Sequence, residues 1–272
     1  MPKRLSLPVS LALVAVFGGV AALILTSSAA MSGLGTRFGL IAAEAALVLP
    51  GIFALLLLRK PVGTSLALEA PSRALVTLAI LSGAALWGAS LGLFETQSLL
   101  FPPSDAFLEA FERLHEALSP SGVWDALASL VAIALTPAVC EELLFRGILL
   151  RSLGESYGWA AGILGAALLF GLIHVMPLGH QISFYRVPFA FSVGLGLGLL
   201  RVRSGSLVPP ILAHATLNAI TFLAAIPLVG QDLPHGADPL APFGPPLFAV
   251  GAGAFFLLLM RFRALTSETG PA

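Results

Sequence analysis

The stretch "VWDALASLVAIALTPAVCEELLFRGILL", residues 123–150, is long and apolar enough to cross a lipid bilayer as one helix. It nevertheless carries two adjacent glutamates, Glu141 and Glu142, and an arginine, Arg146. A charged residue at the centre of such a helix costs about 2.5–3.5 kcal/mol, whereas an apolar residue gains only about 0.3–0.6 kcal/mol. The stretch therefore predicts a membrane helix that needs partner helices or a position near the membrane surface.

The remainder of the chain is equally apolar. Of its 272 residues, 57% are hydrophobic and 10% are charged, whereas a soluble domain has about 25% charged residues. This composition disfavours a soluble helical protein and predicts an all-α fold, a polytopic membrane helix bundle with about eight transmembrane helices. The expected spans lie near residues 6–27, 37–58, 75–97, 123–151, 157–175, 184–201, 207–229 and 244–262.

Basic residues indicate how the spans are oriented. Most of them fall on one side of an eight-span topology, which we expect to be cytoplasmic. This arrangement predicts a multi-pass protein of the cell inner (plasma) membrane with both termini in the cytoplasm. Arg37 and Arg186 fall on the other side.

The first apolar stretch has a second interpretation. Lys3 and Arg4 precede it, and Ser28-Ala29-Ala30 could be a cleavage site, as in a secretory signal peptide. The run from Leu5 to Leu25 is long for such a signal, and we expect an uncleaved span.

One amphipathic helix is predicted between the third and fourth spans. In "PPSDAFLEAFERLHEAL", Ser104 or Asp105 can cap a helix. Apolar residues lie on one face at helical spacing and acidic residues on the other. We expect this helix to lie on the membrane or to cap the bundle.

Charge and cysteine content exclude several classes of function. The formal net charge is zero, so no basic patch indicates nucleic-acid binding. The single cysteine, Cys140, excludes an internal disulfide and a Cys-cluster metal site. We expect Cys140 to be a small buried hydrophobic residue.

The charged residues of the opening stretch divide into a pair and a single carboxylate. Glu142 and Arg146 are four residues apart, so they share a helical face and can pair. Glu141 points about 100° away from Glu142 and lacks an obvious partner on its own helix. An ionisable residue of this kind inside a membrane is a functional candidate, although a salt-bridge cluster that merely ends the helix is the alternative.

Polar residues of two other spans repeat at one-turn spacing. Phe170 and His174 are four apart, and so are His214 and Asn218. Antiparallel hairpins would bring Glu141, His174, His214 and Asn218 together in one cavity, which we expect to open to the cytoplasmic half. A carboxylate can remove a proton from water, and imidazole and amide groups can stabilise an oxyanion. This set favours hydrolysis of an amide bond.

At these residues the sequence resembles the CAAX-protease and bacteriocin-processing family, the intramembrane peptidases related to the eukaryotic Ras-converting endoprotease. The resemblance covers roughly residues 123–228. Its first motif appears as Glu141-Glu142-Leu-Leu-Phe-Arg146, the second as Phe170 to His174, and the third as His214 to Asn218.

The resemblance implies a role for each residue. Glu141 with His174 would activate the attacking water, His214 and Asn218 would stabilise the oxyanion, and Glu142 with Arg146 would be an orienting pair, with Phe170 in support. It also implies either zinc held by His174, His214 and Glu141 or a metal-free glutamate mechanism. The implied partners are the lipid bilayer and a membrane-associated peptide or protein substrate.

The resemblance also divides the chain. Residues 1–122 would be N-terminal transmembrane helices with the amphipathic helix, 123–228 the catalytic core, and 229–272 a C-terminal transmembrane helix and tail. Two other functional classes stay open: a proton-coupled transporter, and a non-enzymatic membrane scaffold or immunity protein, both using the same buried polar residues. Gly88-Ala89-Ser90 weakly suggests a serine-type protease.

Overall fold

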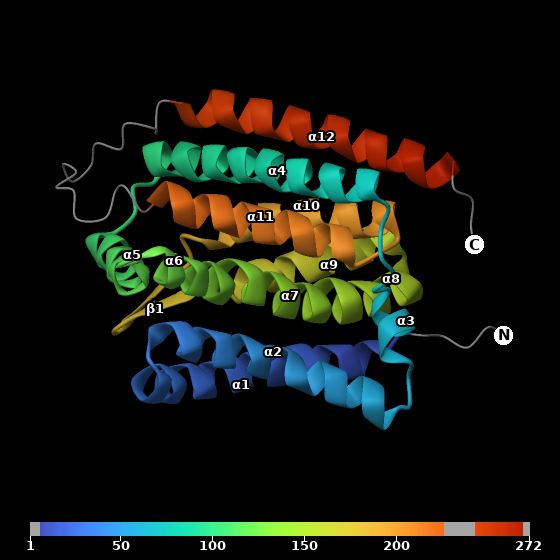
Figure 1. The fold of residues 1–272 in the computed structure, drawn as a ribbon, viewed down its shortest axis with the longest axis horizontal. Helices are drawn as coiled ribbons and strands as arrows, with labels where there is room; N and C mark the ends of the chain where they lie inside the picture. The colour runs from blue at the N-terminus through green and yellow to red at the C-terminus, as the bar shows by residue number, and fades with distance from the viewer. Residues whose placement is uncertain (1–5, 226–242, 269–272) are drawn as a thin grey trace.

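The computed structural model describes residues 6–225 and 243–268. Long helices run side by side in a layered bundle, with the α1–α2 hairpin along one edge and α4 and α12 along the other (Figure 1). Within the described ranges, seven helices are long and apolar enough to cross a membrane. The helices outside the segment 123–172 are α1 (Val9–Leu34), α2 (Thr36–Leu57), α3 (Val62–Leu66), α4 (Arg73–Leu100), α5 (Asp105–Leu118), α10 (Val187–Ser204), α11 (Val208–Ala225) and α12 (Gly244–Glu268).

The charged opening stretch forms the central helix, which runs from Val123 to Tyr157. Its parts are α6 (Val123–Leu130), the π-helical segment η1 (Val131–Leu135), α7 (Thr136–Glu142), the π-helical segment η2 (Leu143–Leu149) and α8 (Leu150–Tyr157). Pro137 follows η1. Proline has no backbone N–H and cannot make the regular helical hydrogen bond, and the wider π turn accommodates this missing bond. The two π segments flank α7, which carries both glutamates.

The predicted fifth span is shorter than expected. Helix α9 (Trp159–Leu172) has 14 residues, about 21 Å at helical rise, against a hydrocarbon core of about 30 Å. The expectation of a full span over 157–175 was therefore wrong in its length.

A small hairpin replaces the missing helical turns. Strand β1 (Met176–Leu178) pairs antiparallel with β2 (Gln181–Ser183), and Met176 lies opposite Ser183. Gly179 in the turn has a φ of 64°, a conformation that glycine adopts without strain. The all-α prediction is confirmed apart from these two three-residue strands, which the sequence reasoning missed together with α3.

Helix α5 is the predicted amphipathic helix. Ser104 caps it, because its side chain accepts a hydrogen bond from the Phe107 N–H at 3.3 Å. Phe107 and Leu118 are buried, while the acidic residues of the opposite face are exposed. The helix caps one end of the bundle, where β1 also lies (Figure 1).

The opposite end is closed by hydrogen bonds between segments that are far apart in sequence. Ser6 donates to Glu155 at 2.7 Å, and Arg151 donates to the Thr64 carbonyl at 2.9 Å. The Leu207 N–H donates to the Ala67 carbonyl at 2.8 Å. The predicted cytoplasmic side corresponds to this end, and that orientation stays a prediction.

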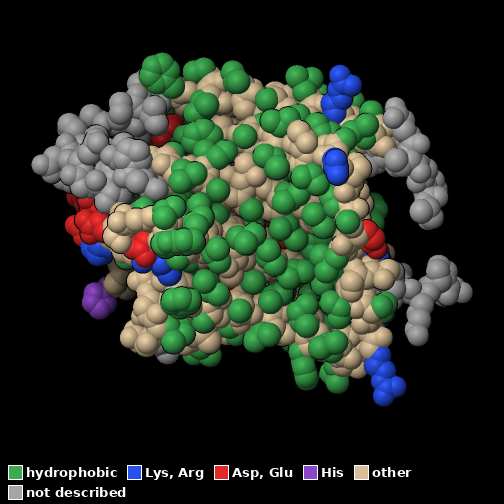
Figure 2. Space-filling model, in the orientation of Figure 1, with side chains coloured by type: hydrophobic (Ala, Val, Ile, Leu, Met, Phe, Trp, Pro, Cys, Tyr) green, Lys and Arg blue, Asp and Glu red, His purple; other side chains and the backbone are tan. Residues whose placement is uncertain are grey.

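The outer surface matches a lipid environment. Hydrophobic side chains cover the visible face, and charged side chains lie mainly toward the two ends of the bundle (Figure 2). Trp124 is 81% exposed and Leu25 is 77% exposed, which is unfavourable in water and favourable in hydrocarbon. Together with the seven long apolar helices, this surface makes the chain a multi-pass membrane protein.

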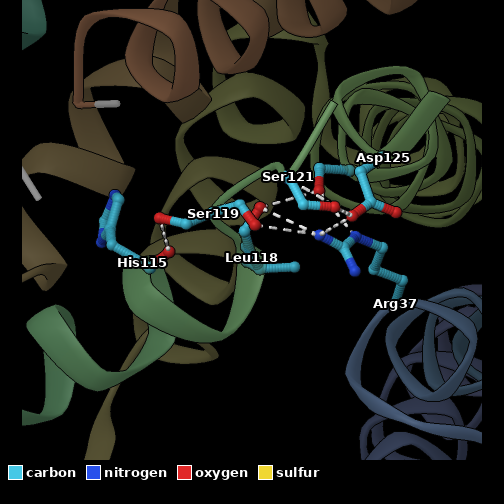
Figure 3. Close-up of polar contacts among 7 residues, drawn as sticks. Arg37, His115, Leu118, Ser119, Ser121 and Asp125 are labelled. Carbon is cyan, nitrogen blue, oxygen red and sulfur yellow. Dashed lines mark hydrogen bonds and ion pairs between the residues drawn. The ribbon is translucent and has the colours of Figure 1, made fainter. Parts of the chain in front are cut away.

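Arg37 joins the start of α2 to the connection between α5 and α6 (Figure 3). Its Nε donates to the buried Ser129 hydroxyl at 2.8 Å, and its Nη2 donates to the Ser119 carbonyl at 3.2 Å. Asp125 lies 3.9 Å from the same guanidinium. One arginine side chain therefore holds three segments together at the α5 end.

Replacing Arg37 by Met should destabilise this end of the protein. A hydrogen bond to a charged group contributes about 1.5–3 kcal/mol, and the substitution also leaves the Ser119 carbonyl without this donor. We expect a clearly lower melting temperature in detergent and faster proteolysis of the connection between α5 and α6. Arg113→Met, on the exposed face of α5, is the control, and equal melting of both variants would contradict the assignment.

Candidate active site

The predicted site residues come from three parts of the bundle. Glu141 and Glu142 lie on α7, His214 and Asn218 lie on α11, and His174 follows the end of α9. Glu141, Glu142 and His214 are buried, with Glu142 completely inaccessible. The structure thus brings carboxylates and imidazoles from separate helices into one buried region.

Arg146, Glu142 and His214 form a continuous polar network. Arg146 Nη1 donates to Glu142 Oε1 at 2.6 Å, and Nη2 donates to the Gly194 carbonyl at 3.2 Å. The same Glu142 oxygen lies 3.0 Å from His214 Nδ1. The predicted i,i+4 pair is present, and it also fixes an imidazole on another helix.

This network determines which ring nitrogen of His214 is available to accept a hydrogen bond. A carboxylate oxygen accepts hydrogen bonds, so His214 Nδ1 carries the proton and donates it to Glu142. His214 Nε2 then has the free lone pair, and it lies 3.7 Å from Glu141 Oε2. That separation exceeds a direct hydrogen bond, and a water molecule bridging the two atoms would join them.

Phe170 packs at the centre of the site. Its ring centroid lies 4.3 Å from Arg146 Cζ, in cation–π geometry, and 5.9 Å from the His214 ring. The His174 ring lies on its other side, with centroids 4.8 Å apart. Phe170 therefore contacts Arg146 of the buried ion pair as well as both imidazole rings.

His174 has a defined tautomer as well. Its Nδ1 lies 2.8 Å from the Phe170 carbonyl, which only accepts, so Nδ1 carries the proton and Nε2 is an acceptor. Burial in the cavity wall, followed by the nearby Arg186 guanidinium, lowers the pKa of His174 to about 3. The imidazole is therefore neutral at neutral pH and is able to accept a proton or a hydrogen bond.

A cavity of about 600 Å³ connects these groups. All four predicted catalytic residues line it: Glu141, His174, His214 and Asn218. Phe170 also lines it, whereas Glu142 and Arg146 are not among its lining residues. The structure thus separates side chains that can touch a substrate from a pair that can act only through His214.

The lining shows toward which end of the bundle the cavity extends. It includes Leu118 of α5 and Met176 of β1, so the cavity extends toward the end of the bundle opposite the Arg151 and Thr64 contacts. The side of the membrane that this end faces, and with it the expected opening to the cytoplasmic half, stays a prediction.

Three further ionisable side chains line the cavity and were not predicted as site residues. They are Glu44 of α2, His115 of α5 and Arg186 just before α10. Glu44 could have been found, because it is an ionisable residue within an apolar span, the criterion that selected Glu141. No comparable sequence signal singles out His115 or Arg186.

The residues of the remaining sequence hypotheses have ordinary surroundings. Cys140 is buried, as expected. Ser90 donates to the Leu86 carbonyl at 2.7 Å within its own helix, which gives no support to a serine nucleophile. Among the described residues, no three His, Cys, Asp or Glu side chains are arranged to hold a metal ion. His174, His214 and Glu141 as placed therefore do not form a three-ligand set, and the choice between zinc and a metal-free mechanism stays a prediction.

Comparisons with known proteins bear on the segment that holds this site. Residues 123–220 match the model of the family described as type II CAAX prenyl endopeptidase, Rce1-like. The chain is 26% identical over 133 residues to an uncharacterized 24.3 kDa protein of Escherichia coli. This alignment covers 49% of this chain and 58% of the relative. The chain is also 30% identical over 135 residues to CAAX prenyl protease 2 of Homo sapiens. That alignment covers 44% of this chain and 38% of the relative.

These matches are partial, since the aligned segments span 58% of the Escherichia coli relative and 38% of the human relative. No solved structure matches the chain significantly. The matched segment nevertheless contains every predicted catalytic residue, from Glu141 to Asn218. Residues 123–220 of this membrane protein are therefore similar to the Rce1-like family, described as type II CAAX prenyl endopeptidase.

Proposed function

We propose that this protein is an intramembrane endopeptidase that hydrolyses a peptide bond of a membrane-associated substrate. The observation that carries the proposal is the placement of Glu141 Oε2 3.7 Å from His214 Nε2, in a cavity that His174 and Asn218 also line. A carboxylate, two acceptor imidazole nitrogens and an amide are the groups that hydrolysis of an amide needs.

Glu141 is the proposed general base. A water molecule between Glu141 Oε2 and His214 Nε2 would lose its proton as it attacks the carbonyl carbon of the substrate. His174, with Nε2 available, would assist this proton transfer. The carboxylate is 7% exposed and lies among apolar neighbours, where charge–charge and charge–dipole interactions are stronger than in water.

Asn218 and His214 are the proposed oxyanion stabilisers. The Asn218 amide can donate directly to the oxyanion. His214 can donate from Nε2 only after Glu141, 3.7 Å away, has passed on the proton that it took from water, and the Glu142 carboxylate on Nδ1 stabilises the resulting imidazolium. Arg146 donates to that carboxylate and holds it in place, so the Glu142–Arg146 pair acts by orienting and tuning His214.

The experiment that tests the function uses purified protein in liposomes with a library of lipid-anchored fluorogenic peptides. We expect cleavage products, detected by mass spectrometry, and no solute flux. Flux of a solute or of protons without cleavage would instead assign the buried ionisable residues to transport. Absence of both activities would favour a non-enzymatic scaffold or immunity role.

Metal dependence is a separate prediction. Because the described donors do not form a three-ligand set, we expect turnover to persist after dialysis against a zinc chelator. Elemental analysis of the same sample measures zinc directly. Stoichiometric zinc that is lost in His174→Ala, with activity restored by added zinc, would contradict this expectation and show a zinc enzyme.

A further inference from the structure

Glu44 is a carboxylate of the cavity that lies outside residues 123–220, the segment that matches the Rce1-like family model. It is located on α2, eight residues after Thr36, about 12 Å along the helix at 1.5 Å per residue. Helix α2 packs against α7, and Glu44 lines the cavity together with Glu141. Two carboxylates from different helices therefore face the same enclosed space.

The Glu44 carboxylate is incompletely satisfied. Its Oε2 atom is buried and has no hydrogen-bond partner among the described residues. Burying such a group without a partner costs about 1–3 kcal/mol, and more when the group is charged. A buried polar group that lacks a partner in the protein itself is a candidate to bind a ligand group.

The charges around the cavity indicate which ligand group would fit. Its lining contains two acids, Glu44 and Glu141, but only one guanidinium, Arg186. Arg186 interacts electrostatically with Glu141, and no ion pair between Arg186 and Glu44 is present among the described residues. Among the described residues that line the cavity, two carboxyl groups face one guanidinium group, and Glu44 is the acid without an ion-pair partner.

We propose that Glu44 is a specificity-determining residue that binds a cationic side chain, lysine or arginine, of the peptide in the cavity. The inference rests on the proposed endopeptidase function and names a property of its substrate. The cation would enter from the α5 end, and its charge would balance Glu44 in surroundings of low dielectric constant. The remaining lining is largely apolar, including Leu40, Leu47 and Val193, and would hold the apolar residues of the peptide.

The test is a binding measurement, which does not depend on hydrolysis. The probes are palmitoylated, fluorescent Leu/Ala nonapeptides that carry one lysine at each central position in turn, each matched by a norleucine peptide of similar size. Fluorescence anisotropy in detergent micelles should show about tenfold tighter binding of one lysine peptide by the wild type. Glu44→Gln should remove this preference while binding of the norleucine peptide stays within about twofold.

Two further variants sharpen the test. Glu112→Gln makes the same chemical change on the exposed face of α5 and should keep the full preference. Glu44→Asp withdraws the carboxylate by one methylene and should retain a weaker preference, so it decides the question if the Gln variant does not fold.

Three results would overturn the proposal: equal binding of the lysine and norleucine peptides by the wild type, an unchanged preference in Glu44→Gln, or an unchanged preference in Glu44→Asp. Cleavage of the same peptides is measured in parallel. A lysine preference that depends on Glu44 but comes without cleavage would support the cation site and count against the endopeptidase proposal.

Discussion

Glu141→Gln should abolish peptide cleavage while leaving the protein folded. Glutamine has nearly the same shape as glutamate, but its amide cannot take a proton from water. General base catalysis contributes about 10²–10⁴-fold to a rate, so turnover should fall by at least two orders of magnitude. The measurement is kcat/KM for a cleaved lipid-anchored peptide, in the wild type and in the variant.

The stability of this variant separates chemistry from folding. The Glu141 carboxylate is buried, and its Oε2 atom lies 3.7 Å from His214 Nε2, beyond direct hydrogen-bond distance. Removing a poorly compensated buried charge is neutral or stabilising, so the melting temperature should stay the same or rise. Glu112→Gln on the exposed face of α5 is the matched control and should keep full activity. Turnover of Glu141→Gln within twofold of the wild type would exclude Glu141 as the base.

An inactive, folded Glu141 variant is also a tool for finding the substrate. The variant keeps the cavity and its apolar lining, so it should retain bound peptides that the wild type would release as products. Identification of these peptides by mass spectrometry would give the substrate sequence around the cleaved bond. A cationic residue at a fixed distance from that bond would agree with the proposed role of Glu44.

Local sequence patterns predicted the helices because each span is a long, predominantly apolar stretch bounded by polar residues. The same patterns failed at the end of α9. The apolar run continues past Leu172, but the chain leaves the helix there, and His174 donates to the Phe170 carbonyl in place of a longer helix. Tertiary contacts at the cavity override the local helix propensity at this point. Hydropathy does not indicate such contacts.

The site residues were predictable where a spacing implied a shared helical face. Glu142 and Arg146, four residues apart, pair as expected. What spacing cannot give is the distance between helices, and the contact of His214 with both glutamates depends on how α11 packs beside α7. Glu44 met the criterion that selected Glu141, an ionisable residue within an apolar span, but its place in the cavity depends on the packing of α2 against α7, which spacing does not give.

Replacing Arg146 by Met should destabilise the protein more than any other single change considered above. Arg146 and Glu142 are both fully inaccessible, and their bond is 2.6 Å long. Removing one partner of a buried ion pair costs about 3–5 kcal/mol, because the remaining charge has no compensation. We expect a large drop in melting temperature in detergent and loss of activity. Arg146→Lys should recover only part, because a lysine cannot reach both Glu142 and the Gly194 carbonyl as the guanidinium does.

The double variant Glu142→Gln with Arg146→Met distinguishes an uncompensated charge from lost packing. Glutamine at 142 is neutral, and its amide oxygen can still accept the hydrogen bond from His214 Nδ1. If the buried charge causes the destabilisation, the double variant should melt at a higher temperature than Arg146→Met alone. If lost packing around Phe170 and Gly194 causes it, the two substitutions should add. Even when folded, the double variant should cleave more slowly than the wild type, because a neutral amide stabilises the His214 imidazolium less than a carboxylate does.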